Sequence, residues 1–431
     1  MSSGLGRSVA LFRDREFAAL AGTAFARSQA YSTVLIALAL YAEQFDTTGF
    51  VEGLFGTSFA LAQLLIVLPL GRKIDTGNAK RFLLAGLVVN VAVFGGFALV
   101  ENATHVVLMR VAQGVGASIL WITGSTVVGE ISPDDQSGRW LGSYNQVAAF
   151  SSLAGDVVGG YLLYAYDFRL TYLVLSLVTI GAFVLVFAFL RDNPGGKTDP
   201  AEATSVETFR TLLGRPMVRA LVSFRLTFSF GKMAVIIFLP ILARTEFGIS
   251  AFAIGWILAG GKLTKSILQG YTGELTDRIG RKPYFVAAGA LLYGVGTAAI
   301  PLSYVAEGTL NPVTVGFAGN TVELGGAFFA LFAAYGLLGV ADSLRLPASM
   351  SLFVDEGERF DSVASSMSLR SISWKVGQVI GPAVVGIIID LVSTTAAFLT
   401  AAGFIVVATT VFTVVQARER QTTATVSTLG D

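Results

Sequence analysis

Twelve apolar stretches of about 20 residues each recur along the chain, and they constrain its fold more than any other feature. A helix rises about 1.5 Å per residue, so each stretch can cross roughly 30 Å of hydrocarbon. Backbone polar groups find no water in lipid, so we expect each stretch to be helical. The predicted spans are residues 17–42, 51–71, 81–100, 105–129, 139–163, 169–190, 217–243, 250–272, 283–304, 325–350, 362–389 and 393–416.

The composition excludes most other classes of protein. Of the 431 residues, 53% are hydrophobic and only 14% are charged, against roughly 25% charged in a soluble chain. This apolar excess excludes a soluble fold and intrinsic disorder. The chain has no cysteine, one histidine and no acidic cluster within a span, so we expect no metal site, no cofactor and no enzymatic activity. The prediction is an all-α membrane protein without a nucleic-acid partner.

Basic residues are distributed unevenly between alternate loops. With the N-terminus in the cytoplasm, nineteen Lys and Arg residues fall in inner segments, and only Arg169 and Arg244 fall in outer loops. Positively charged loops stay on the cytoplasmic side, so we predict that both termini are cytoplasmic. The first sixteen residues lack the apolar region of a signal peptide, so we expect the first span to be retained in the plasma membrane.

The longest inner connection, residues 191–216, is rich in proline, glycine and charge. It predicts a cytoplasmic linker between a six-helix bundle at residues 1–190 and a second bundle, with a short cytoplasmic tail, at residues 217–431. Within the linker, residues 206–213 fit either a short amphipathic helix at the membrane surface or a plain solvated segment.

The loop that follows the eighth span carries the pattern Gly-x3-Asp-Arg-x-Gly-Arg-Lys. Its members are Gly273, Asp277, Arg278, Gly280, Arg281 and Lys282. The loop after the second span holds a partial copy with Gly71 and Asp75, in which Thr76 stands at the position of the arginine. The two aspartates lie 202 residues apart, which predicts a duplicated six-helix unit.

Two further patterns lie inside the spans. The fourth span contains an Arg-x-x-Gln-Gly sequence formed by Arg110, Gln113 and Gly114. Glycines recur near four-residue spacing in the fifth and eleventh spans, at Gly155 and Gly159, and at Gly377 and Gly381 with Pro382. This spacing places the glycines of each span on one helix face, which predicts close helix packing.

With these motifs the sequence resembles the major facilitator superfamily over its whole membrane region. The resemblance implies two pseudo-symmetric six-helix bundles around a central cavity, with access that alternates between the two sides. It also implies that the charged loop at residues 273–282 latches the two halves together, although the loop also fits a topology determinant alone. Antiporters of this family carry a proline in the fifth span where this chain has Asp156, which weakens the likeness to antiporters.

Nine basic residues fall at membrane depth, opposed by only two acids well inside a span. The basic residues are Arg27, Arg110, Arg225, Lys232, Lys262, Lys265, Arg345, Arg370 and Lys375. A charge in mid-bilayer costs at least ~2.5–3.5 kcal/mol, so we expect these residues to face the bundle interior or a cavity. Four lie near the midplane and form the predicted binding layer for an anion: Arg27, Lys232, Lys262 and Lys375.

The two intramembrane acids are Asp156 and Asp342, and both are candidates for proton coupling, of which Asp156 is the favoured one. Asp342 and Arg345 are three residues apart on one helix, so we expect them to pair. Asp156 lies among glycines, where it fits either a carboxyl that gains and loses a proton or the partner of a fixed ion pair.

We therefore predict a monomeric secondary active transporter that moves a small organic or phosphorylated anion, coupled to protons or another ion. One alternative is a proton-coupled multidrug or small-molecule efflux antiporter, and another is a non-transporting receptor of the same fold. The basic midplane favours the anion, because lipophilic cations are repelled by nine basic residues. The long outer loop at residues 305–324 contains no motif that adds to this prediction.

Overall fold

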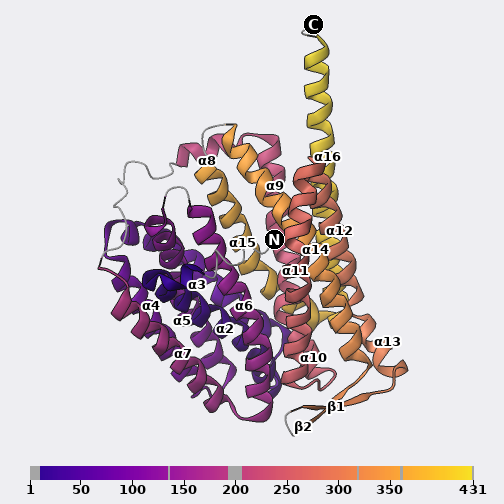
Figure 1. The fold of residues 1–431 in the computed structure, drawn as a ribbon. Helices are drawn as coiled ribbons and strands as arrows, with labels where there is room; N and C mark the ends of the chain where they lie inside the picture. Colours follow the sequence, from indigo (N-terminus) through magenta and orange to yellow (C-terminus); the bar gives the residue numbers. More distant parts are fainter. Residues whose placement is uncertain (1–9, 134–135, 193–205, 318–319, 360–362, 430–431) are drawn as a thin grey trace. The chain divides into compact units, whose positions relative to one another are not determined.

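A computed structural model of the chain describes residues 10–133, 136–192, 206–317, 320–359 and 363–429. Almost all of these residues are helical (Figure 1). They form two compact units. Unit 1 comprises Met1–Thr47, Leu54–Glu202 and Arg244–Ala259, and unit 2 comprises Thr48–Gly53, Ala203–Ala243 and Gly260–Asp431. The predicted bundle boundaries at residues 190 and 217, and the orientation of the termini, remain predictions.

The first half of the chain consists of a 3-10 turn and six long helices. They are η1 (Leu11–Arg13), α2 (Arg15–Gln44), α3 (Gly49–Thr76), α4 (Ala79–Phe97), α5 (Ala103–Ile131), α6 (Ser137–Ala165) and α7 (Phe168–Phe189). The second half continues with α8 (Val206–Leu213), α9 (Pro216–Met233), η3 (Ala234–Phe238), α10 (Leu239–Thr245), α11 (Ala251–Ile279), α12 (Lys282–Ala299) and α13 (Leu302–Thr309). A hairpin and three helices follow: β1 (Val313–Phe317), β2 (Asn320–Leu324), α14 (Gly326–Glu358), α15 (Val363–Leu391) and α16 (Thr394–Leu429).

The predicted spans fall on helices, apart from end residues and one break. By length and composition, ten helices of the described residues can cross a membrane, or eleven if the bent pair α12 and α13 is counted as one span. The first predicted span, in α2, is not in that set of described helices. Three consecutive polar residues, Arg27, Ser28 and Gln29, interrupt its apolar run and lower its mean hydropathy. The fold is thus an all-α membrane fold.

The ninth predicted span, residues 283–304, is not one straight helix. α12 ends at Ala299, α13 begins at Leu302, and the two helices are bent by 49°. Pro301 lies at the break. Proline has no N–H to donate and its ring clashes with the preceding turn, which explains the bend. The expectation of a continuous helix is therefore wrong at the C-terminal end of this span.

Glycines on α6 and α15 allow two helix pairs to approach closely. A Cβ on Gly155 of α6 would clash with the carbonyl oxygen of Gln29 on α2. A Cβ on Gly377 of α15 would clash with the carbonyl oxygen of Leu226 on α9. Close contacts also occur one turn later at Gly159 and Gly381. The predicted close packing is confirmed, and it recurs in equivalent form in the two halves.

The segment at residues 206–213 forms α8, which confirms the helical alternative of the prediction. Leu212 is buried in a cluster with Val218 of α9 and Leu369 of α15. The apolar side of α8 therefore packs against α9 and α15 within unit 2. Residues 193–205 of the predicted linker lie outside the described residues, and the position of α8 at the membrane surface remains a prediction.

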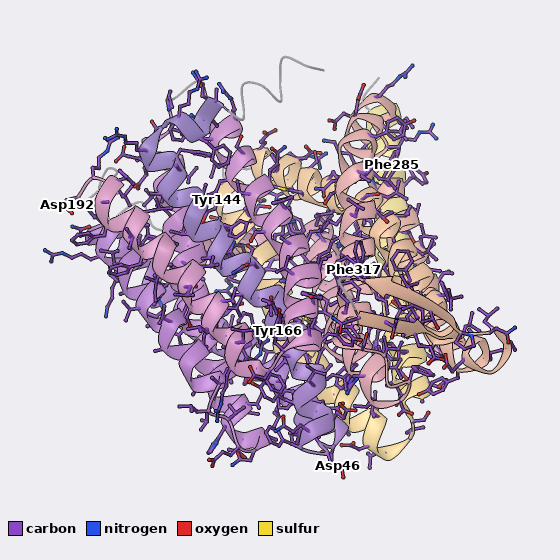
Figure 2. The ribbon with its side chains drawn as sticks, turned by 60° about the horizontal axis from the view of Figure 1, so that its bottom comes forward. Asp46, Tyr144, Tyr166, Asp192, Phe285 and Phe317 are labelled. Atoms are coloured by element: carbon purple, nitrogen blue, oxygen red, sulfur yellow. The ribbon has the colours of Figure 1, made fainter. Side chains whose placement is uncertain are left out.

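The long loop without a motif, residues 305–324, contains the end of α13 and a β-hairpin (Figure 1). β1 pairs antiparallel with β2, and Figure 2 labels Phe317 at the end of β1. The Glu307 carboxylate on α13 accepts a hydrogen bond of 2.7 Å from Ala327 N. A negative charge is favourable at a helix N-terminus, so this bond stabilises the start of α14 next to the hairpin.

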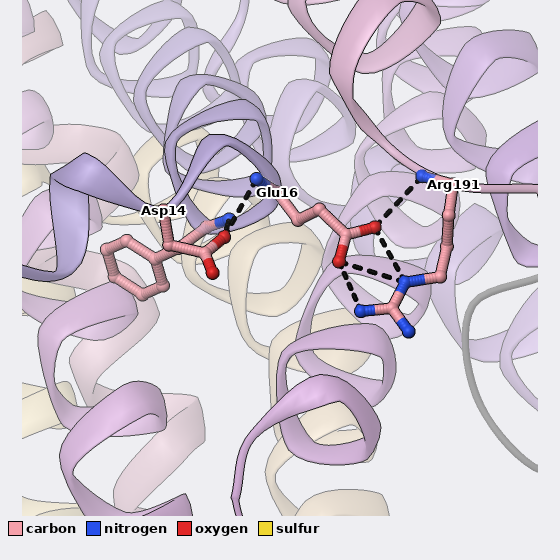
Figure 3. Close-up of polar contacts among 4 residues, drawn as sticks. Asp14, Glu16 and Arg191 are labelled. Carbon is pink, nitrogen blue, oxygen red and sulfur yellow. Dashed lines mark hydrogen bonds and ion pairs between the residues drawn. The ribbon is translucent and has the colours of Figure 1, made fainter.

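Polar contacts join the start of α2 to Arg191, two residues after the end of α7, in unit 1 (Figure 3). The Asp14 carboxylate caps α2 by accepting hydrogen bonds from Glu16 N and Phe17 N, each at 2.9 Å. Arg191 Nε donates to the Glu16 carboxylate at 2.8 Å. Glu16 precedes the apolar part of the first span, and its hydrogen bonds with Arg191 lower the pKa of its carboxyl.

Candidate functional site

A cavity of about 170 Å³ lies within unit 2. It is lined by side chains and backbone of α9, η3, α11, α12 and α14. The lining residues are Lys232, Ile236, Gly261, Lys262, Lys265, Tyr293, Tyr335, Leu338, Gly339 and Asp342. Three lysines oppose one carboxylate in this lining, so its formal charge is positive. A concave site with a few converging polar groups is the usual form of a small-molecule site.

Asp342 lies between two cations. Its Oδ1 accepts a hydrogen bond of 2.9 Å from Arg345 Nη2, and its Oδ2 accepts one from Lys232 Nζ. Lys232 Nζ also lies 5.0 Å from the centre of the Tyr293 ring, whose negative face attracts a cation. The predicted pair of Asp342 with Arg345 is confirmed. Lys232 is a second partner, contributed by another helix.

An irregular helix segment follows Lys232. α9 ends at Met233, and the next five residues, η3 (Ala234–Phe238), form a π-helical turn. Pro240 lies at the start of α10, and because proline has no N–H, the preceding turn loses a donor and a regular ladder is not available there. Single π-helical turns are frequent at functional sites. Here the turn contributes Ile236 to the cavity lining.

Two glycines bring α11 and α14 together at the cavity wall. A Cβ on Gly261 would lie 2.5 Å from the carbonyl oxygen of Tyr335, and one on Gly339 would clash with the carbonyl oxygen of Gly261. Neither position has room for a side chain, so the two backbones are in direct contact. This contact places Lys262 and Tyr335 on the same cavity.

The structure brings two of the four predicted binding residues together. Lys232 and Lys262 line the cavity. Lys375 of α15 is buried, with 9% of its surface exposed, but is not among the described residues that line it. Arg27 belongs to unit 1, where it lies near Tyr144 of α6. Its Nε is buried without a hydrogen-bond partner among the residues that the structure describes.

The two predicted coupling acids lie in different surroundings. Asp342 lines the cavity of unit 2. Asp156 is fully buried on α6 in unit 1. The first turns of α11 approach it closely, because a Cβ on Gly255 would clash with the carbonyl oxygen of Asp156. Both acids are therefore shielded from bulk water, and their roles in coupling remain predictions.

The signature segment at residues 273–282 is a loop only near its end, because α11 continues through Gly273 and Asp277 to Ile279 and α12 begins at Lys282. The expectation of a loop over the whole segment is therefore wrong. Gly280 has φ +66°, a conformation that glycine adopts without strain, which allows the tight turn between the two helices. Asp277 and Arg278 are exposed at the end of α11. Lys282 Nζ donates to both Asp355 oxygens at 2.8 and 2.9 Å, which joins α12 to α14. The latch role of Asp277 remains a prediction, as do the roles of Gly273 and Arg281.

The partial copy in the first half is arranged in a similar way. α3 continues past Gly71 and Asp75 to Thr76, and the turn to α4 follows at Gly77 and Asn78. Asn78 then caps α4, and its side chain accepts a hydrogen bond of 3.3 Å from Arg81 N. The gating roles predicted for Gly71 and Asp75 remain predictions.

The fourth-span motif joins α5 to α3 within unit 1. Arg110 is fully buried. Its Nε donates to the carbonyl oxygen of Phe55 at 2.7 Å, and its Nη1 donates to Gln113 Oε1 at 2.6 Å. The guanidinium carbon lies 4.2 Å from the centre of the Phe59 ring. A Cβ on Gly114 would lie 2.5 Å from the carbonyl oxygen of Phe59, so this glycine allows the close approach.

Sequence reasoning expected Lys265 to face the interior or a cavity but left it out of the predicted binding layer, and it did not predict the two tyrosines of the lining. Lys265 lies three residues after Lys262, a spacing that places both on one face of α11, so this signal was available. Tyr335 lies seven residues before Asp342, which also corresponds to one helix face. Tyr293 had no distinguishing signal, because aromatic residues are common in all the spans.

Comparisons with known proteins agree with this architecture. A family model described as Major Facilitator Superfamily matches residues 20–231 and again 224–429. An uncharacterised MFS-type transporter of Methanocaldococcus jannaschii is 21% identical over 363 residues, which is 82% of this chain and 86% of the relative. The multi-drug resistance efflux pump PmrA of Streptococcus pneumoniae is 24% identical over 217 residues, 49% of this chain and 53% of the relative.

A solved structure has the same fold. The crystal structure of a bacterial homologue of the human lysosomal transporter Spinster matches with a TM-score of 0.73 and 16% sequence identity. The match covers 94% of this chain and 97% of that structure. At this identity the likeness shows the fold, and the substrate has to be argued from the residues of this chain.

Proposed function

This chain belongs to the major facilitator superfamily, and from that premise we propose that it is a proton-coupled secondary active transporter of a small organic or phosphorylated anion. Its relatives are transporters, and it is an integral, multi-pass membrane protein rather than an enzyme. The observation that carries the anionic substrate is the cavity in unit 2, where Lys232, Lys262 and Lys265 oppose Asp342.

The charge of this cavity determines which ligands bind well. Lysine is a point charge with three donors and can follow an anion of varied shape. Lys262 and Lys265 lie on α11, whereas Lys232 lies on α9, so an anion in the cavity contacts more than one helix. A ligand that joins helices stabilises one arrangement of them, which is the requirement for alternating access.

Asp342 supplies the basis for proton coupling. Its carboxylate binds Lys232 and Arg345. Protonation of Asp342 weakens the ion pair and leaves Lys232 available to the substrate anion. A proton and an anion then enter the same site together without a large change in its net charge.

The anionic substrate is tested with purified protein in proteoliposomes. Inorganic phosphate, succinate and citrate serve as anionic probes, and ethidium serves as a lipophilic cation. We expect saturable uptake of at least one anion and a reduction of at least tenfold in kcat/KM with Lys262→Gln. The matched control is Arg219→Gln, which removes an exposed charge from α9 and should transport normally. Transport of ethidium alone, unaffected by Lys262→Gln, contradicts the proposal.

Proton coupling is tested with Asp342→Asn and Asp156→Asn in the same vesicles. We expect Asp342→Asn to abolish accumulation driven by a pH gradient while counterflow of labelled anion persists. Asp156→Asn should retain the pH dependence if Asp342 is the coupling acid. Unchanged pH dependence in both variants contradicts proton coupling by either residue.

A second candidate is a multidrug efflux antiporter, favoured by the printed function of the relative from Streptococcus pneumoniae. Ethidium extrusion from cells that express the chain distinguishes the two. Extrusion that depends on Asp342 but not on Lys262 supports the efflux pump. Absence of any flux, for all probes, supports a receptor of the same fold.

A further inference from the structure

Three arginines from three helices of unit 2 meet at the level of Arg225, seven residues before the cavity residue Lys232 on α9. They are Arg225 of α9, Arg345 of α14 and Arg370 of α15. Arg225 and Arg345 are 7% and 1% exposed. All three guanidinium groups lie close enough to repel one another electrostatically. Such an arrangement costs stability unless an anion or a carboxylate compensates it.

Two of these arginines are held in fixed orientations. Arg225 Nε donates to the carbonyl oxygen of Arg370 at 2.7 Å, and its guanidinium carbon lies 4.9 Å from the centre of the Trp374 ring. Arg345 lies 3.8 Å from the centre of the Phe228 ring and donates from Nη2 to Asp342. The aromatic faces and hydrogen bonds immobilise the planes of both guanidinium groups.

Other nitrogens of the same side chains have no acceptor. Arg225 Nη1, Arg345 Nε, Arg345 Nη1 and Arg370 Nε are buried without a hydrogen-bond partner among the described residues. A buried polar group without a partner costs about 1–3 kcal/mol, more when it is charged. Asp342 is the carboxylate that faces this cluster, and it already binds Lys232 and Arg345. One shared carboxylate cannot neutralise three arginines.

We propose that Arg225, Arg345 and Arg370 form a binding site for a compact oxyanion, such as a phosphate, sulfate or carboxylate group. Arginine presents forked donors that match the oxygens of such groups, and charge-assisted bonds of this kind are strong. Arg225 precedes Lys232 by seven residues on α9, which separates the two layers by about 10 Å along the helix. The arginine site adjoins the lysine-lined cavity through Asp342, which binds both Lys232 and Arg345. Its three basic residues are not among the residues that line that cavity, so the site does not depend on which substrate the cavity carries.

Anion binding by the full-length protein in lipid nanodiscs tests this site directly. Sulfate, inorganic phosphate and succinate are titrated at constant ionic strength, with chloride as the reference salt, and both Kd and unfolding temperature are measured. Sulfate and phosphate binding identifies a tetrahedral oxyanion site, and succinate binding identifies a carboxylate site. We expect at least one of the three to raise the unfolding temperature saturably, because a ligand that binds the folded state stabilises it.

Two substitutions separate a binding site from a structural cluster. Arg370→Gln should weaken oxyanion binding at least tenfold and raise the unfolding temperature without anion, because it removes like-charge repulsion. Arg225→Lys keeps the charge but loses the fork, so it should weaken binding without raising that temperature. Arg219→Gln is the matched control on the exposed side of α9 and should change neither quantity.

Three results overturn the proposal. The first is that no oxyanion stabilises the protein more than chloride does. The second is that Arg370→Gln lowers the unfolding temperature without anion and leaves oxyanion affinity unchanged, which indicates a structural role. The third is that Lys262→Gln abolishes oxyanion binding while Arg370→Gln does not, which assigns the anion to the lysine-lined cavity. Transport measurements do not enter this test, so its failure is distinguishable from failure of the proposed transport function.

Discussion

At the scale of single residues, the buried arginines of this chain differ in how far their nitrogens are hydrogen-bonded. Arg110 donates to Phe55 O and to Gln113, and the ring of Phe59 covers it. The three arginines of unit 2 instead retain buried nitrogens without a partner among the described residues. A satisfied buried charge indicates a structural role, whereas an unsatisfied one indicates a ligand.

Arg110→Met is therefore expected to act on stability. The change removes the second donor to the carbonyl oxygen of Phe55, which keeps its bond within α3, and it leaves the buried side chain of Gln113 without the Arg110 donor, at about 1–3 kcal/mol. The unfolding temperature in detergent should fall, and transport should fall only in proportion to the folded fraction. Normal unfolding with lost transport indicates instead that Arg110 acts in gating.

The ion pair of Glu16 with Arg191 leads to a pH prediction. The folded protein holds the pKa of Glu16 below its ordinary value of 4.5, so the pair stabilises the fold above that value. This contribution is lost as the pH falls through the lowered pKa. Because Arg191 is exposed and Glu16 is only partly buried, the contribution of the pair is about 1 kcal/mol or less.

Unfolding temperatures of the wild type and Glu16→Gln measure this effect between pH 7 and pH 3. The variant should unfold earlier at pH 7, and the difference should decrease as the pH falls toward the acid end. Glu246→Gln, an exposed glutamate of unit 1, is the control and should show no pH-dependent difference. A difference for Glu16→Gln that persists at acid pH contradicts an electrostatic origin.

At the scale of elements, two helix pairs depend on glycine. Gly155 on α6 contacts the backbone of α2, and Gly377 on α15 contacts the backbone of α9. These contacts are equivalent in the two halves, so one packing device is used twice. Small residues replace the hydrophobic effect as the means of helix association in lipid.

Alanine at these glycines is expected to separate the helices. Gly155→Ala and Gly377→Ala place a methyl group against a carbonyl oxygen, and overpacking of this kind costs about 1–3 kcal/mol. Gly142→Ala on α6 and Gly403→Ala on α16 have open space around the added carbon. These controls should be neutral or stabilising by about 0.4–1 kcal/mol. Equal unfolding temperatures for all four variants contradict the packing role.

The helices were predictable because their signal is local. Apolar length and glycine spacing are read from neighbouring residues, and both correspond to the observed helices and contacts. The bend at Pro301 was also marked in the sequence but was not predicted. Lys282 and Asp355 pair across 73 positions, and no local pattern indicates such a contact.

The candidate site was predictable only in part for the same reason. Lys232 and Lys262 were found because a charge inside a span needs an explanation. Tyr293 and Tyr335 line the same cavity, but an aromatic residue in an apolar span needs none. Which face of a helix meets the cavity depends on how the helices are rotated, and rotation is a property of the packed unit.

At the scale of the whole molecule, the duplication produces two units with different electrostatic character. The three lysines of the cavity and the neighbouring cluster of three arginines lie in unit 2. Arg27, Arg110 and Asp156 lie in unit 1. Similar helix packing therefore supports different chemistry in the two units.

The predicted topology is a property of the whole chain and can be tested with the cysteine-free sequence. Asn311→Cys lies in the predicted outer loop, and Arg278→Cys lies in a predicted inner loop. A membrane-impermeant maleimide should label Asn311→Cys in intact cells and Arg278→Cys only after permeabilisation. The parent chain is the control and should not be labelled. The reverse pattern contradicts the predicted orientation.

The π-helical turn after Lys232 has a consequence for the length of the chain. A π-helical turn holds one residue more than an α-helical turn. The turn therefore absorbs an extra residue without rotating α9 against α10. Deleting one residue of Ala234–Phe238 would restore regular winding and leave Lys232 and the buried residues of α10 in their present directions. The chain between Lys232 and α10 thus holds one residue more than a regular helix needs, and the irregular turn is where that residue is accommodated.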